Sequence, residues 1–201
     1  KKSDENNQTV KVNFVWTAAH VVDNLRNERS VVDPKTGTKR QIVEFRDAQI
    51  VQELREDGRR VGEIKMDAKV IRFSDADNGE DLALLMVRKQ GFVNVSAAFY
   101  LNETIPPIGT SLFHVGSLLG QVGANSMTTG IMSQHGRVLQ LGSGDGTVFD
   151  QTTCTAFPGS SGGGVFLSGQ HSDEEWTKVK GQYIGMLVRG AGEGFNLVVP
   201  V

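Results

Sequence analysis

A serine framed by glycines is the part of the sequence best suited to chemistry. Ser161 lies within Gly159-Ser160-Ser161-Gly162-Gly163, after Pro158. Glycines allow tight backbone angles that other residues avoid. Bare N–H groups beside a serine can stabilise the oxyanion that forms when its hydroxyl attacks a carbonyl carbon. A flexible Gly/Ser loop is the competing interpretation, because the chain holds 24 glycines in 201 residues. A base and an acid elsewhere decide between the two.

The four histidines offer the base, and an aspartate before an apolar run offers the acid. His20 follows a strand-like run and lies among small apolar residues, where a histidine is most often a core residue. Asp81 precedes the apolar run 82–87, where lost hydration requires a partner; a turn cap is its other interpretation. The three residues explain one another if they meet. Aspartate then accepts from one imidazole nitrogen, and the other nitrogen takes the proton of the serine hydroxyl.

The elements that must position these residues read as short strands. Apolar and polar residues alternate over 10–16, and a short turn of helix follows at His20. Beyond that turn no segment shows sustained helical periodicity. The linker 102–109, with two prolines and a glycine, divides the strands into two comparable sets. Many short strands separated by turn residues predict an all-β fold of barrels or sandwiches. The other strand-like runs are 41–54, 59–73, 81–87, 111–115, 126–133, 147–153, 164–167, 182–188 and 195–201.

Composition excludes several classes of function. A net charge of -2 gives no basic footprint for nucleic acid. No apolar run approaches the roughly 20 residues of a membrane span. The polar start carries no signal-peptide core, although a leader could have been removed. Cys154 is the only cysteine, so no internal disulfide can form, and we interpret it as a small packed residue.

Other motifs compete for the same residues and fail on spacing. The glycine-framed serine also fits the elbow of α/β-hydrolases, but that fold needs alternating helices and a histidine after the acid. The histidine after Ser161 is His171, ten positions on and followed by a charged loop. Asp75–Gly79 resembles a calcium loop with its glycine one position early. The run 142–146 precedes a strand, which argues against a phosphate cradle. The histidines show no metal spacing, so we predict neither metal nor cofactor.

Three motifs occur in the order His, Asp, Ser, and together they resemble the chymotrypsin-like serine proteases. They are Thr17-Ala18-Ala19-His20, Asp81-Leu82-Ala83-Leu84-Leu85 and Gly159-Ser160-Ser161-Gly162-Gly163. The resemblance covers nearly the whole chain. It implies two six-stranded antiparallel Greek-key β-barrels, one in residues 1–108 with the histidine and aspartate and one in 109–201 with the serine.

Further stretches are similar to the HtrA/DegP branch of that family. Val115–Gly120 resembles its VGSPLG stretch, Met127–Ser133 its VTSGIVS strand and Tyr183–Met186 one of its last strands. The sequence departs from the family at Ser160, where an aspartate or asparagine is usual, and at Gly164, which replaces a proline. The chain also begins too late to contain the first strand of the first barrel. We therefore expect flanking domains or partner subunits in the intact protein.

The resemblance implies roles for individual residues. Ser161 is the nucleophile, His20 the general base and then acid, and Asp81 the orienting carboxylate. The N–H groups of Gly159 and Ser161 form the oxyanion hole. The residues implied in substrate binding are Thr155 at the base of the primary pocket and Val188, Arg189, Gly190, Gly194 and Asn196 in its walls.

The predicted function is a serine endopeptidase that cleaves protein or peptide substrates through an acyl-enzyme. Thr155 is uncharged, so we expect cleavage after uncharged residues of small to medium size. Arg189 offers another outcome, because it could recruit acidic substrate residues. Two alternatives stay open: a latent or inactive protease fold that acts as a binding module, and a viral polyprotein protease of the same fold.

Overall fold

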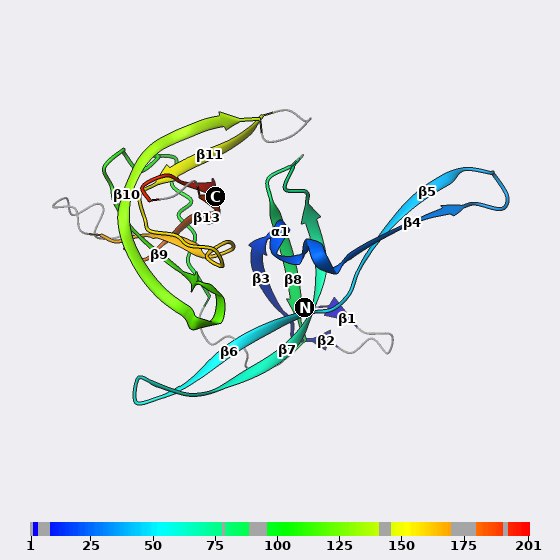
Figure 1. The fold of residues 1–201 in the computed structure, drawn as a ribbon, viewed down its shortest axis with the longest axis horizontal. Coiled ribbons are helices and arrows are strands. Elements are labelled where there is room, and N and C mark those ends of the chain that lie inside the picture. Colours follow the sequence, from blue (N-terminus) through cyan, green and yellow to red (C-terminus); the bar gives the residue numbers. More distant parts are fainter. Residues whose placement is uncertain are drawn as a thin grey trace. The chain divides into compact units, whose positions relative to one another are not determined.

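A computed structural model describes residues 2–3, 9–77, 79–88, 96–140, 146–169, 180–190 and 193–201. Antiparallel strands dominate it, which confirms the predicted all-β class (Figure 1). The chain forms two compact units, each of which is assembled from three separate segments of the sequence. Unit 1 holds Lys1–Trp16, Val22–Phe73 and Ala83–Asn94, and unit 2 holds Thr17–Val21, Ser74–Leu82 and Val95–Val201. The predicted division into 1–108 and 109–201 stays a prediction.

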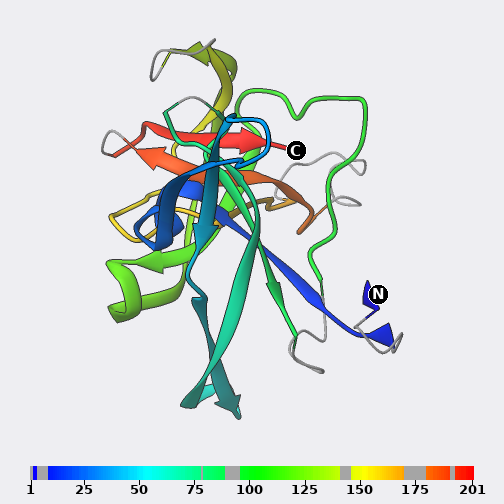
Figure 2. The ribbon, with the colours of Figure 1, turned by 90° about the vertical axis from the view of Figure 1, so that its right-hand side faces the viewer.

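Unit 1 is built on a four-stranded sheet in the order β3-β8-β7-β6. The long strands β6 and β7 pair as a twisted ribbon, cyan to blue-green in Figures 1 and 2. Asp57 and Gly58 make the two-residue turn between them, as an Asp-Gly pair favours. The strands are β3 (Asn13–Ala18), β6 (Ala48–Glu56), β7 (Arg59–Ser74) and β8 (Leu82–Val87), with the separate pairs β1 (Lys2–Ser3)–β2 (Thr9–Val10) and β4 (Arg26–Val32)–β5 (Lys39–Phe45).

Unit 2 is a closed six-stranded barrel in the order β10-β11-β14-β13-β12-β9, with every pair antiparallel. Its interior is apolar, with Leu112, Phe149, Val165 and Leu187 almost fully buried. Figure 1 shows β10 as a long arc, and its pairing with β11 shifts register twice along the way. The strands are β9 (Ser111–Leu118), β10 (Gly123–Leu139), β11 (Thr147–Thr152), β12 (Gly164–Leu167), β13 (Tyr183–Gly190) and β14 (Asn196–Pro200).

The strand predictions hold in outline and differ in detail. Unit 2 is the six-stranded barrel that the sequence predicts, whereas the described strands of unit 1 form a four-stranded sheet and two strand pairs. The run predicted over 41–54 is two strands, because β5 ends at Phe45 and β6 begins at Ala48. The predicted helical turn is α1 (Ala19–Val22), followed by the 3-10 turn η1 (Asp23–Leu25). A second 3-10 turn, η2 (Gly120–Val122), joins β9 to β10. In the described parts of the chain no helix is long and apolar enough to span a membrane.

Candidate active site

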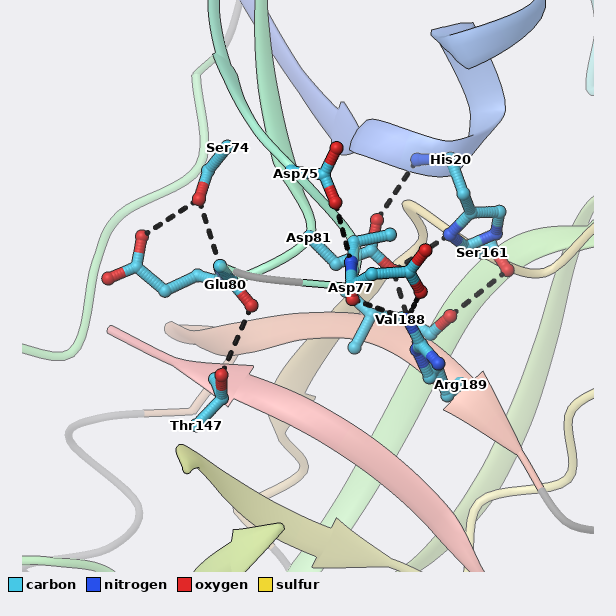
Figure 3. Close-up of polar contacts among 12 residues, drawn as sticks. His20, Ser74, Asp75, Asp77, Glu80, Asp81, Thr147, Ser161, Val188 and Arg189 are labelled. Atoms are coloured by element: carbon cyan, nitrogen blue, oxygen red, sulfur yellow. Dashed lines mark hydrogen bonds and ion pairs between the residues drawn. The ribbon is translucent and has the colours of Figure 1, made fainter. Parts of the chain in front are cut away.

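Asp81 holds His20 at two points. Its Oδ2 lies 2.8 Å from His20 Nδ1, and its Oδ1 accepts a hydrogen bond from the His20 backbone N–H at 3.0 Å (Figure 3). Its backbone carbonyl also accepts from the N–H of Ala19, at 3.0 Å. A carboxylate can only accept at neutral pH, so the proton of a neutral His20 ring sits on Nδ1 and leaves Nε2 as the basic nitrogen.

The two partners differ sharply in exposure. The Asp81 side chain is 1% exposed and the His20 side chain 40% exposed. The flanking Ala18 and Ala19 are fully buried, so they anchor the turn while the histidine ring points outward. The idea that His20 is a core residue is therefore wrong. Asp81 has a left-handed backbone, with φ at 57°, a region that aspartate tolerates better than most residues.

Ser161 lies on a turn that closes on itself. Ser160 is 1% exposed. Its hydroxyl oxygen accepts a hydrogen bond from the Phe157 N–H at 3.1 Å, and its own N–H donates to the Phe157 carbonyl oxygen at 2.9 Å. Its carbonyl oxygen accepts from the N–H of Gly163 at 3.0 Å. Within the described residues, the N–H groups of Gly159 and Ser161 take no part in these bonds. Both remain available to a group outside the turn.

Two glycines let this turn approach its neighbours. Gly159 has φ at 96°, and a Cβ on it would lie 2.6 Å from the Ser117 carbonyl oxygen. Gly162 has φ at 86°, and a Cβ there would collide with Thr17 Oγ1. Thr17 is three residues from His20, so the close approach at Gly162 seats the serine turn against the segment that carries the histidine. The glycine frame is therefore a packing requirement and not a flexible loop.

The Ser161 hydroxyl donates to the carbonyl oxygen of Val188 at 3.3 Å. In Figure 3 the His20 ring lies between Asp81 and Ser161, with Nδ1 toward Asp81 and the opposite edge toward Ser161. Thr17–Val21, Ser74–Leu82 and Val95–Val201 all belong to unit 2, so the three predicted catalytic residues lie in one compact unit. The acid and the imidazole lie within hydrogen-bond distance of each other, and Figure 3 draws the Ser161 hydroxyl on the far side of the ring.

The residues predicted for the substrate pocket divide into two groups. Asn196 is buried and donates from Nδ2 to the Cys154 carbonyl at 2.8 Å, next to Thr155. It pairs with Gly190 across β13 and β14, where a Cβ on Gly190 would collide with Asn196 Oδ1. Three of the predicted pocket residues, Thr155, Gly190 and Asn196, therefore lie near one another. Gly194 lies in the turn before β14, where a Cβ would meet no atom within 4 Å.

The Arg189 side chain contacts the loop that carries Asp77 and Asp81. Its guanidinium Nη2 donates to the carbonyl oxygen of Ala76 at 2.6 Å, and its Nε lies 3.8 Å from Asp81 Oδ2. Figure 3 draws Arg189 beside the loop that carries Asp77 and Asp81. Its part in substrate binding stays a prediction. Sequence reasoning missed the contact with Asp81, because 108 residues of chain separate the two positions.

His114 is a second residue that sequence reasoning missed. It is fully buried on β9, and neither ring nitrogen has a partner in ordinary hydrogen-bond geometry. A Cβ on Gly163 would collide with its Nε2, so the ring lies directly under the serine turn. Burial lowers the pKa of His114, and the nearby Ser160 carbonyl opposes the shift in part. The alternation of side chains along a strand could have identified His114, because it places His114 on the same inward face as Leu112.

No group of three or more histidine, cysteine, aspartate or glutamate side chains in the described residues could hold a metal ion.

Comparison with known proteins agrees with this arrangement. The family profile described as trypsin-like peptidase domain matches residues 5–171. Among solved structures, the HtrA-type protease AlgW, in a serine-to-alanine form with a decapeptide, is 22% identical with a TM-score of 0.55. That match covers 93% of this chain and 44% of the AlgW chain, so this chain spans less than half of its length.

A second solved structure, Deg5, is 23% identical with a TM-score of 0.55, over 93% of this chain and 72% of the Deg5 chain. At these identities the structural matches show a shared fold. No curated protein sequence matches the chain significantly. The profile match extends over most of the chain and includes the positions of His20, Asp81 and Ser161. The chain belongs to the trypsin-like peptidase family.

Proposed function

We propose that the protein is a serine endopeptidase whose triad is His20, Asp81 and Ser161. The observation that carries the proposal is the two-point hold of Asp81 on His20, through the backbone N–H at 3.0 Å and Nδ1 at 2.8 Å. This hold fixes the ring plane and the tautomer together. It leaves Nε2 unprotonated on the side where Ser161 lies, which is what a general base for a hydroxyl requires.

The reaction follows from these positions. Ser161 Oγ attacks the carbonyl carbon of the scissile peptide while its proton moves to His20 Nε2. The oxyanion that forms is stabilised by the N–H groups of Gly159 and Ser161. His20 then gives its proton to the leaving amine, and the C–N bond breaks to leave an acyl-enzyme. Water attacks the ester after losing a proton to His20, and that proton returns to Ser161 as the acid leaves.

Ser161 must rotate before it reacts. Its hydroxyl donates to Val188 O at 3.3 Å, a long bond for an O–H donor. Rotation about one side-chain bond exchanges this contact for His20 Nε2, and exposed or half-buried rotamers interchange on the picosecond to nanosecond scale. The exchange is therefore fast compared with ordinary turnover of 1–1000 per second.

Substrate selection rests on the group formed by Thr155, Gly190 and Asn196. These residues are uncharged, so a substrate Lys or Arg would lose hydration there without a compensating carboxylate. We propose that an extended peptide pairs with the strand end at 188–190 and places an uncharged side chain at Thr155. Digestion of a peptide library gives the answer: dominant cleavage after Lys or Arg would overturn this assignment.

The function is tested with Ser161→Ala and a fluorophosphonate probe that labels activated serines. We expect the wild type to label and to cleave peptides, and Ser161→Ala to lose labelling and about 10⁴- to 10⁶-fold in kcat. Ser30, exposed on β4 in unit 1, provides the control, because Ser30→Ala removes a hydroxyl far from the turn in sequence. Turnover that survives in Ser161→Ala would refute the triad. A folded wild type that neither labels nor cleaves would favour the latent binding module.

A further inference from the structure

Arg189 links the strand beside the nucleophile to the loop that carries the acid. It follows Val188, whose carbonyl oxygen accepts the Ser161 hydroxyl. From β13 its side chain reaches the segment 76–81, where Nη2 donates to Ala76 O at 2.6 Å and lies 3.9 Å from Asp77 Oδ1. Its Nε lies 3.8 Å from Asp81 Oδ2, the oxygen that faces His20 Nδ1 (Figure 3).

The carboxylate of Asp81 needs such a partner. It is 1% exposed, and a buried carboxylate without compensation is costly. The backbone N–H of His20 donates to Asp81 Oδ1, and His20 Nδ1 lies 2.8 Å from Asp81 Oδ2. Arg189 supplies a positive charge 3.8 Å from Asp81 Oδ2, and its side chain is 32% exposed. Its bond to Ala76 O fixes where that charge sits, because guanidinium N–H groups have a rigid planar geometry.

We propose that Arg189 is a positioning residue that holds the Asp81 loop against β13 and so keeps the acid, the base and the nucleophile in one geometry. The proposal rests on the proposed function of the same site. It gives Arg189 a role other than contact with substrate. Among the described residues, Arg189 lies within 4 Å of the carboxylates of Asp77 and Asp81, and Asp81 in turn contacts His20.

The two roles of Arg189 predict different kinetics. A positioning residue acts on every substrate alike, so its loss lowers kcat while KM stays near the wild-type value. A substrate-recruiting residue acts on acidic substrates alone and changes their KM.

The experiment uses Arg189→Met and Arg189→Lys in the full chain, with one neutral peptide and a matched peptide that has glutamate next to the cleaved bond. We expect Arg189→Met to lose about 10- to 100-fold in kcat on both peptides, because a small misplacement of catalytic groups costs this much. Arg189→Lys keeps the positive charge but lacks the planar guanidinium, so its kcat should lie between those of the wild type and Arg189→Met. It also serves if Arg189→Met does not fold, which melting curves reveal.

Arg137→Met is the matched control. Arg137 is a partly buried arginine of unit 2 that donates to Gln151 and stacks over Phe195, so its loss removes the same charge without touching Asp81. We expect its kcat to match the wild type. Loss confined to the glutamate peptide, or wild-type kcat in a folded Arg189→Met, would overturn the proposal. A wild type without fluorophosphonate labelling would instead show that the proposed function has failed.

Discussion

Replacement of Asp81 by asparagine tests the hold on His20 with the smallest possible change. Oδ1 of Asp81 accepts a hydrogen bond from the His20 backbone N–H, which is always a donor. In an asparagine side chain only the carbonyl oxygen can accept this bond. The asparagine must therefore keep its carbonyl there and turn its NH₂ toward His20 Nδ1. Nδ1 then becomes an acceptor, the ring proton moves to Nε2, and the nitrogen that faces Ser161 can no longer take a proton.

The expected loss is about 10⁴-fold in kcat at neutral pH, which the same exchange of tautomer costs in a triad. At 1.36 kcal/mol for each factor of ten, this corresponds to about 5 kcal/mol of activation free energy. The fold should survive, because asparagine tolerates the left-handed backbone at position 81, where φ is 57°. Asp81→Asn also removes the negative charge beside Arg189, which should slightly lower the free energy of unfolding.

The assay is hydrolysis of a chromogenic peptide at pH 7.5 by the wild type, Asp81→Asn and Asp150→Asn. Asp150 is the matched control, because its carboxylate lies 3.7 Å from His135 Nδ1 and accepts from the Gly136 N–H, a similar pair in the same unit. Asp150→Asn should keep wild-type kcat. A folded Asp81→Asn with kcat within tenfold of the wild type would refute the tautomer argument.

Two further predictions concern groups buried near the turn. Burial lowers the pKa of His114 from 6.5. Below about pH 6.5 the unfolded chain therefore binds a proton more readily than the folded chain does, and the free energy of unfolding decreases as the pH is lowered. His114→Phe should flatten this fall in urea unfolding between pH 5 and 7.5, and equal slopes for both proteins would count against it. Cys154 is fully buried, and burial raises the pKa of its thiol, so thiol reagents should leave the native protein unmodified and fully active. Rapid modification of the native thiol would contradict this.

Strand alternation and turn residues predict most of the barrel, since both express local geometry. They predict the ends of a strand wrongly where the strand continues into a polar part of the sequence. The run 126–133 extends in the structure as β10, Gly123–Leu139, because two register shifts let Gln134 and Arg137 stay paired with β11. A shift of this kind depends on the partner strand. The sequence pattern of a single segment carries no trace of it.

The candidate site divides in the same way. Its three central residues could be predicted because the motifs around them are local: an apolar frame for His20, an apolar run after Asp81 and glycines around Ser161. The exposure of His20 and the direction of Arg189 could not. Both depend on contacts between segments far apart in the chain, as the 3.8 Å approach of Arg189 to Asp81 illustrates.

The self-closed turn at Ser160 has a consequence for how such a site is controlled. Its three bonds join residues 157, 160 and 163, and none of them draws on the charge of a freshly cut chain end. A turn closed by neighbours forms when the barrel forms, because closing so short a loop costs little entropy. The shape of the turn is then set as the barrel folds. For the proposed function, these bonds would let the turn take its shape without cleavage of the chain.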